Sequence, residues 1–412
     1  MDSLSDRLKS LGFKPAVSIQ KPPRDRRLTL EQVIGGYEVV NSAGAFVKKD
    51  QLFPWDYQHG NVRFSQKIDT HTLHQSARID YAPDALERML FIDTETSGLS
   101  GGAGTFAFLI GVGCFREGGF LLEQLIIRDP SEEMAMLLHL AHMVKPDTIF
   151  VSFNGKSFDI PLVQNRLVLN KLPVHLRELA HVDILHISRK LWRRTLPSCT
   201  LKELEVAILG FPRSSEDVPG WMIPDIYFEY LRTNDPARLS DVIYHNAQDI
   251  VSLAALMIHI SRLFEFDQSD EDISTDDLFA ISRVYWDLGS HDIAEKISQR
   301  ILTRELTSAQ LLSANAMLGQ YHKLKKSLPK ALTHWEIAAA QGDPYACVEL
   351  AKYYEHKQCD FLIALVWCEK CSTILKQSPK TVVPLTFQRD LERRITRLQL
   401  KGKNNVHTTH QE

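Results

Sequence analysis

The most constraining feature of this 412-residue sequence is the order of apolar segments that begins at Met89. Three short apolar segments follow one another, and an amphipathic segment then precedes a fourth short apolar one. The pattern predicts strands at residues 89–93, 106–115, 120–127 and 148–152, and a helix at residues 131–144. Consecutive strands followed by alternating helices and strands favour an α/β domain, a mixed sheet flanked by helices on both faces.

The remaining segments differ in composition on either side of this domain, to which we assign residues 89–264. Residues 1–30 are rich in Lys, Arg, Ser and Pro and are expected to be a mobile arm. Residues 31–88 mix strand-like pieces with turns and are expected to form an extended segment that packs on the domain. The acidic residues 265–277 suggest a linker. We expect a helical domain at 278–400 and a disordered tail at 401–412.

The helical part contains a loose internal repeat. Tyr285, Tyr321 and Tyr354 recur 36 and 33 residues apart, and Trp335 and Trp367 are separated by 32 residues. Spacings of this size are typical of tetratricopeptide (TPR) helix pairs. Such pairs stack because none of them buries its apolar face alone. The sequence therefore favours an all-α, TPR-like repeat domain, which we expect to bind a protein partner.

Two acidic residues stand at the end of the first apolar strand of the α/β domain. Asp93 and Glu95 are two positions apart, so their side chains share one face of a strand. Like charges near a core repel each other unless a cation compensates them, and hard divalent cations prefer such oxygen ligands. A metal site is one interpretation of this pair, and a solvated strand end is the other.

Two further acidic residues lie on predicted helices. Asp159 begins a helix after a strand and a glycine-containing turn, and the alternative is a simple acidic residue favoured by the helix dipole. Asp249 lies inside a long helix predicted at residues 238–264. His245 is roughly 40° from Asp249 on a helical wheel, whereas Tyr244 is roughly 140° away. His245 thus shares the face of Asp249, although a buried structural histidine is the common alternative.

These three segments, in this order, resemble the DEDD-type 3′–5′ exonuclease branch of the RNase H-like superfamily over residues 89–260. The resemblance rests on Asp-x-Glu at Asp93, on Asn154 followed by Phe-Asp at Asp159, and on a His or Tyr upstream of Asp249. The best-known groups have Tyr four or His five residues before the last Asp. This chain has the opposite arrangement, with His at the four-residue position and Tyr at the five-residue position.

More narrowly, several runs resemble the bacterial YprB-like family, ribonuclease H-like domains with C-terminal TPR repeats. These runs are residues 93–113, 196–199, 218–220 and 245–249. Independent indications of a repeat domain agree with that resemblance.

The resemblance implies a hydrolase with a two-metal-ion site. Asp93, Glu95, Asp159 and Asp249 would bind two Mg²⁺ or Mn²⁺ ions, with Asp93 bridging them, for in-line displacement at a phosphodiester. His245 would orient or deprotonate the attacking water. The implied activity is a 3′–5′ exonuclease that acts on single-stranded ends of DNA or RNA.

Substrate contacts are expected from polar, basic and aromatic residues near these segments. Trp192 with neighbouring basic residues combines a stacking surface with charge, a pairing used to bind single-stranded nucleic acid. Alternatively, Trp192 packs in the core and the basic residues lie in water, as Lys156 also would in a polar turn. The candidates are Thr94, Asn154, Lys156, Trp192, Arg193 and Arg194.

Bulk properties restrict the class of protein. A net charge of −3 argues against binding nucleic acid by overall electrostatics, so a polyanion would be held locally. The apolar run at residues 106–115 is shorter than the roughly 20 residues that span a bilayer, the N-terminus lacks a secretory pattern, and the six cysteines form no disulfide-rich pattern. We therefore expect a cytoplasmic protein without a membrane partner.

Two other functions remain open at this stage. The chain could be a catalytically silent TPR scaffold or nucleic-acid-binding protein, although such a protein has no need of four clustered like charges. An RNase H-like endonuclease would differ only in not requiring a free end. The choice between DNA and RNA leaves no short motif.

Overall fold

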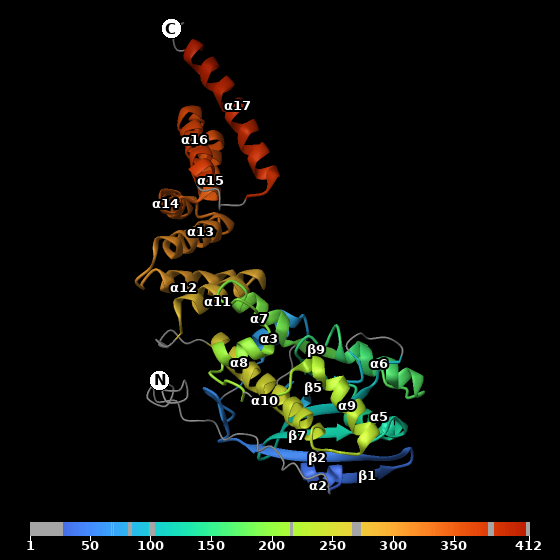
Figure 1. Ribbon diagram of the computed structural model, residues 1–412. Helices are drawn as coiled ribbons and strands as arrows, with labels where there is room; N and C mark the ends of the chain where they lie inside the picture. The colour runs from blue at the N-terminus through green and yellow to red at the C-terminus, as the bar shows by residue number, and fades with distance from the viewer. Residues whose placement is uncertain are drawn as a thin grey trace, which may run out of the picture. The chain divides into compact units, whose positions relative to one another are not determined.

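The structure is a computed structural model. It describes residues 28–66, 68, 70–80, 85–98, 104–214, 217–265, 273–377 and 383–408, with side chains described as far as Lys401. The chain forms two compact units that divide between Glu271 and Asp272 (Figure 1). Most of the expected arm and the middle of the expected linker lie outside the described residues.

A seven-stranded mixed sheet forms the centre of the first unit. Its strand order is β1-β2-β7-β6-β5-β8-β9, antiparallel from β1 to β5 and parallel from β5 to β9. The bounds are β1 (Tyr37–Asn41), β2 (Gly44–Pro54), β5 (Met89–Thr96), β6 (Ala107–Arg116), β7 (Gly119–Ile126), β8 (Ile149–Ser152) and β9 (Ala180–Asp183). The predicted α/β fold with a mixed sheet is confirmed.

Residues 31–88 contribute strands to this sheet rather than only packing on it. β2 pairs with β7 from Val47 to Pro54, and β1 forms the edge. Buried Phe46, Val47 and Phe53 of β2 explain why the segment joins the core. Its other elements are α2 (Leu30–Ile34), β3 (Gln58–His59), β4 (Val62–Arg63), α3 (His71–Ala77) and α4 (Ala85–Arg88).

Helices cover both faces of the sheet. The helix α10 (Leu239–Phe264) packs on β5, β6 and β7. Gly111 of β6 permits this approach, since an added Cβ would lie 2.3 Å from Oδ1 of Asn246. On the opposite face, Tyr227 of α9 (Ile223–Thr233) stacks on Phe108 with ring centroids 4.0 Å apart. That core also contains residues of α5 (Glu133–Met143) and α6 (Asp159–Leu169).

Short elements complete the first unit. They are η1 (Pro130–Glu132), η2 (Leu176–Glu178), α7 (Ile184–Trp192), α8 (Leu201–Ala207) and η3 (Gly220–Met222).

The length and composition of α10 would also suit a membrane span, and among the described residues it alone has this property. It is a longer apolar segment than the run at residues 106–115 considered above. However, 83% of its apolar window is buried inside the protein. This burial is expected of the central helix of a domain whose sheet lies against it.

The second unit is all-helical, as predicted. It contains α11 (Thr275–Asp287), α12 (His291–Ile301), α13 (Ser308–Leu324), α14 (Leu328–Ala340), α15 (Pro344–Tyr353), the π-helix η4 (Tyr354–Gln358), α16 (Phe361–Gln377) and α17 (Leu385–Thr408). Each helix packs on the next along the chain. Gly319 of α13 lies directly against Trp335 of α14, because an added Cβ would be 2.4 Å from the indole ring.

The ends of this unit differ from the sequence-based boundaries. α11 already begins at Thr275, capped by Ser274, so the last residues of the expected acidic linker are helical. α17 continues to Thr408, where we expected a disordered tail from residue 401. Lys401 still lies 3.4 Å from the buried carboxylate of Glu355, so this helix retains tertiary contacts at that point.

Candidate active site

The end of β5 supplies two of the predicted carboxylates. Asp93 and Glu95 lie on the face of the sheet that α10 covers, as the alternation of a strand requires. Nδ2 of Asn246 on α10 donates a 2.9 Å hydrogen bond to Oδ2 of Asp93. The pairing of β5 with β6 shifts register between Glu95 and Thr96, and such irregularities often occur beside active sites.

The first residue of α6 supplies the third carboxylate. Oδ1 of Asp159 accepts hydrogen bonds from the backbone N (3.0 Å) and Oγ1 (2.6 Å) of Thr94. The preceding turn passes very close to this side chain, since a Cβ on Gly155 would lie 3.0 Å from Oδ2 of Asp159 and 2.4 Å from Oγ of Ser152. Thr94 therefore fixes Asp159 against β5.

Asp183, an acidic residue outside the predicted set of four, lies at the end of β9 and shapes the same turn. Its carboxylate accepts hydrogen bonds from the backbone N of Asn154 (2.8 Å), Lys156 (3.2 Å) and Leu185 (3.2 Å). Asn154 has a left-handed conformation with φ of 68°. Asp183 thus supports the turn that presents Asp159, and its charge contributes to raising the pKa of Asp159.

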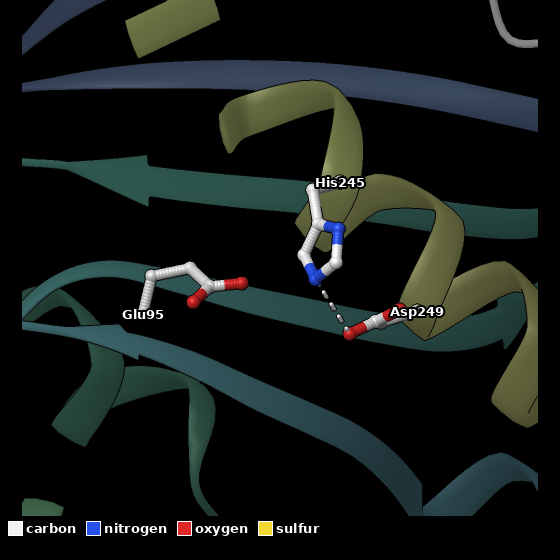
Figure 2. Close-up of side chains that lie close together, drawn as sticks. All are labelled: Glu95, His245 and Asp249. Carbon is white, nitrogen blue, oxygen red and sulfur yellow. Dashed lines mark ion pairs between the residues drawn. The ribbon is translucent and has the colours of Figure 1, made fainter. Parts of the chain in front are cut away.

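The helix α10 supplies Asp249 and His245. Nε2 of His245 lies 3.6 Å from Oδ2 of Asp249, one helical turn away, so the predicted helical phase is correct. Figure 2 shows the Glu95 carboxylate extending towards the same place from β5. Ligand atoms of Glu95, His245 and Asp249 all lie within 4.8 Å of one another, which is a suitable grouping for a cation.

Burial and mutual repulsion disturb the protonation of these carboxylates. Burial and the charges of Asp249, Glu95 and Asp159 hold the pKa of Asp93 well above its usual range. Burial is also the main cause that raises the pKa of Glu95 to about 8 and that of Asp159 to about 6. Burial lowers the pKa of His245, but Asp249, Asp217 and Glu95 outweigh it and raise the pKa to about 10. The other three predicted carboxylates therefore all lie close enough to Asp93 for their charges to act on it.

An arginine that the sequence reasoning missed is part of this centre. Arg213 forms an ion pair with Oδ1 of Asp249 through Nη2. Its Nε and Nη2 also contact the two carboxylate oxygens of Glu205 on α8, at 2.5 and 2.6 Å. The Arg213 side chain is only 6% exposed and Glu205 is fully buried. Asp217 completes the group, with Oδ1 2.8 Å from Nδ1 of His245.

The sequence of α8 contained an indication of the buried cluster formed by Arg213, Glu205 and Asp217. Glu205 follows Leu204 on the face that also contains Leu201 and Ile208, so the helical pattern places an acid among apolar residues. A buried acid needs a cationic partner. The identity of that partner could not be obtained from spacing, because Arg213 and Asp217 lie in the irregular segment between α8 and η3.

The residues expected to contact the substrate differ in how far they are buried. Trp192 is 2% exposed and packs towards His259 of α10. The stacking surface is therefore wrong for Trp192, and the alternative in which it packs in the core is confirmed. The apolar face of α7 carries it into the core. Arg193 and Arg194 are exposed, as is Lys156, which borders a cavity of about 190 Å³ between α3 and α7.

Comparison with known proteins identifies the family. The RNase_H superfamily model RNase_H_2 matches residues 90–261. The uncharacterized protein YprB of Bacillus subtilis (strain 168) is 32% identical over 329 residues, which cover 77% of this chain and 78% of YprB. The chain belongs to the YprB family. Its first unit is an RNase H superfamily domain, and this supports a nuclease-type function for the YprB-like chain.

A solved structure is also similar to the YprB-like chain. The family B DNA polymerase from the hyperthermophilic archaeon Pyrobaculum calidifontis is 15% identical, covering 49% of this chain and 29% of the polymerase chain, with a TM-score of 0.33. A similarity at this level is too low to compare the two sites.

The donor set fits hard divalent cations. Carboxylate oxygens are the ligands that Mg²⁺ and Mn²⁺ prefer. Four carboxylates from β5, α6 and α10 interact electrostatically here, and ligand atoms of two of them, Glu95 and Asp249, lie within 4.8 Å of each other. Burial first, and neighbouring carboxylates second, raise the pKa values of Asp93, Glu95 and Asp159, so ionisation of these groups in the absence of a cation is unfavourable. Divalent cations would balance the charge that ionisation produces.

Proposed function

We propose that the first unit is a divalent-metal-dependent nuclease of the DEDD type, a 3′–5′ exonuclease that shortens single-stranded ends of nucleic acid. The proposal rests on one observation. Three separate elements bring four carboxylates close enough for their charges to act on one another, and these are Asp93, Glu95, Asp159 and Asp249. A domain that only binds a polyanion gains nothing from four carboxylates in one place, because they repel phosphates.

The proposed site would hold two Mg²⁺ or Mn²⁺ ions on these four residues. When bound, such ions activate water and stabilise the charge that develops during in-line displacement at a phosphodiester. Thr94 orients Asp159 through two hydrogen bonds, and Asn246 orients Asp93 through one. Partners of this kind fix the direction of metal ligands.

His245 is the proposed general base. Its Nε2 faces Asp249 of the proposed metal site, whereas its Nδ1 faces Asp217, which lies outside that site. With divalent cations balancing the carboxylate charges that raise the pKa of His245, the neutral imidazole would accept a proton from the attacking water at Nε2. This proposed role of His245 corresponds to that of the Tyr or His in the better-known DEDD groups.

The proposed activity is tested with the full-length protein and linear single- and double-stranded DNA and RNA labelled at the 5′ end. We expect stepwise shortening of single strands with Mg²⁺ or Mn²⁺ and none with EDTA. A circular single strand should resist, since it has no end. Cleavage of the circle would favour the endonuclease alternative, and full activity in EDTA would contradict both metal-dependent alternatives.

For the second unit we propose a TPR-like domain that binds a protein partner. The support is its succession of paired helices and the packing of Gly319 against Trp335 between two of them. A protein that ends at Asp270 should then retain basal hydrolysis if it folds, as measured by circular dichroism. A folded but inactive truncated protein would contradict this division of roles.

A further inference from the structure

The ring of His245 has two different environments at its two nitrogens. Nδ1 lies 2.8 Å from Oδ1 of Asp217, and Nε2 lies 3.6 Å from Oδ2 of Asp249. A neutral imidazole has one N–H and one acceptor nitrogen, so its surroundings decide which nitrogen faces the proposed reaction.

Two groups compete for Nδ1 of His245. Nη1 of Arg213 lies 3.3 Å from Nδ1, and Oδ1 of Asp217 lies 2.8 Å from it. Arginine can only donate, so a bond from Arg213 would require an unprotonated Nδ1, whereas a bond to Asp217 requires a protonated one. The contact with Asp217 is shorter and has an ionised acceptor, which makes the hydrogen bond stronger. In the neutral ring, Nδ1 is therefore the nitrogen that keeps its proton, which leaves Nε2 as the acceptor.

Asp217 is itself held in place. Nη1 of Arg213 lies 3.3 Å from its Oδ2, and each of the two side chains is 6% exposed. Arg213 is in turn fixed by its two-pronged contact with the fully buried Glu205. A guanidinium bound at both sides of its planar fork has little freedom to rotate. The direction of the Asp217 carboxylate is thus set by residues that do not belong to the carboxylate cluster.

We propose that Asp217, fixed by Arg213 and Glu205, is a positioning residue that holds His245 with Nδ1–H towards itself and Nε2 towards Glu95 and Asp249. The kinetic consequence rests on the proposed nuclease function, whereas the choice of protonated nitrogen does not. The same logic applies wherever a buried carboxylate selects the tautomer and orientation of a histidine base.

The test uses full-length Asp217→Asn, with Asp225→Asn as a matched control. Asp225 is exposed on α9, so its replacement makes the same charge change away from the centre. Asparagine has nearly the volume of aspartate but is a weaker, neutral acceptor that can also present its N–H₂ group to Nδ1. We expect kcat to fall by about 100-fold or more, with KM changed by less than about threefold, because orientation of a general base acts on turnover. The control should match the wild type.

A second measurement needs no activity. In metal-free protein labelled with ¹⁵N at histidine, both ring nitrogens of His245 are protonated near neutral pH, so the readout is the position of the Nδ1 proton. This proton should be shifted far downfield by its bond to Asp217, and its resonance is assigned by its absence in His245→Gln. The resonance should persist in Asp225→Asn and move upfield or disappear in Asp217→Asn. An unprotonated Nδ1 in the wild type, or a resonance unaffected by Asp217→Asn, would overturn the proposal even in an active nuclease.

The two measurements separate this proposal from the proposed function. If the wild type hydrolyses no nucleic acid, the nuclease assignment fails while the resonance still decides the role of Asp217. If the wild type is active and folded Asp217→Asn retains full kcat, the positioning role fails and the nuclease assignment stands.

Discussion

Asn246 and Asp93 connect the central helix to the central strand, since Nδ2 of Asn246 donates to Oδ2 of Asp93 at 2.9 Å and to its backbone carbonyl oxygen at 3.4 Å. The orientation of the Asn246 side-chain amide is fixed, because its Oδ1 accepts a 3.0 Å hydrogen bond from Nε2 of Gln124. Asn246 is fully buried, so water does not replace this contact. The side chain of Asp93 is therefore oriented by a neighbour that has no charge of its own.

Replacement of Asn246 by aspartate should impair the site. The variant preserves the shape of the side chain but adds a fifth carboxylate beside Asp93, so activity should fall by about 10- to 100-fold, the scale found for residues that support metal ligands. Steady-state kinetics at saturating Mn²⁺ would measure the effect. Asn234→Asp makes the same change at an exposed position and should be neutral. Equal activities of the two variants would show that Asp93 needs no such support.

His245→Ala should lower kcat by about 100-fold or more, which is the usual scale for loss of a general base. Tyr244→Phe should have little effect, because His245 and not Tyr244 lies one helical turn from Asp249 on the same face. Single-turnover rates of both variants would decide between them. A severe loss in Tyr244→Phe with a mild one in His245→Ala would reverse the assignment of the base.

His59 should make the folded protein less stable in acid. The ring is fully buried, with Nε2 2.8 Å from Oγ of Ser252, and burial followed by the charge of Arg213 lowers its pKa to about 3. The unfolded chain, with an ordinary pKa of about 6.5, takes up a proton that the native state does not. The free energy of unfolding should therefore fall as the pH drops below about 6.5, by up to about 1.4 kcal/mol per pH unit from this residue.

This dependence is measured by urea unfolding in EDTA at pH 7, 6 and 5. His59→Gln should have a shallower fall than the wild type, and comparison of the two cancels the contribution of the carboxylate cluster. His186→Gln, at an exposed histidine, should leave the slope unchanged. If His59→Gln and the wild type had parallel curves, the imidazole of His59 would be equally protonated in both states.

Local periodicity was sufficient to predict the framework and much of the site. Short apolar segments located the strands around Asp93, and helical phase placed His245 beside Asp249. Both features depend on residues within a few positions of one another, where backbone geometry alone fixes direction.

Features that depend on distant partners were not predictable in this way. For Trp192 the sequence left both a stacking surface and core packing open, and only the folded domain shows that α7 turns this residue inward. Residues 31–88 complete the sheet because β7 offers a free edge, which no local pattern reveals. Arg213 reaches Asp249 across 36 positions in the sequence, and this ion pair exists only in the folded domain.

The most direct test of the account compares wild type with Asp93→Asn on a 5′-labelled single strand, with Mn²⁺ and with EDTA. Asp93→Asn removes a buried carboxyl group whose ionisation is disfavoured by burial and by its acidic neighbours, so the metal-free variant should be at least as stable as wild type in thermal unfolding. The account predicts Mn²⁺-dependent hydrolysis by the wild type and none by this folded variant. Undiminished hydrolysis by Asp93→Asn, or by the wild type in EDTA, would contradict the assignment of the four carboxylates as the metal-binding active site.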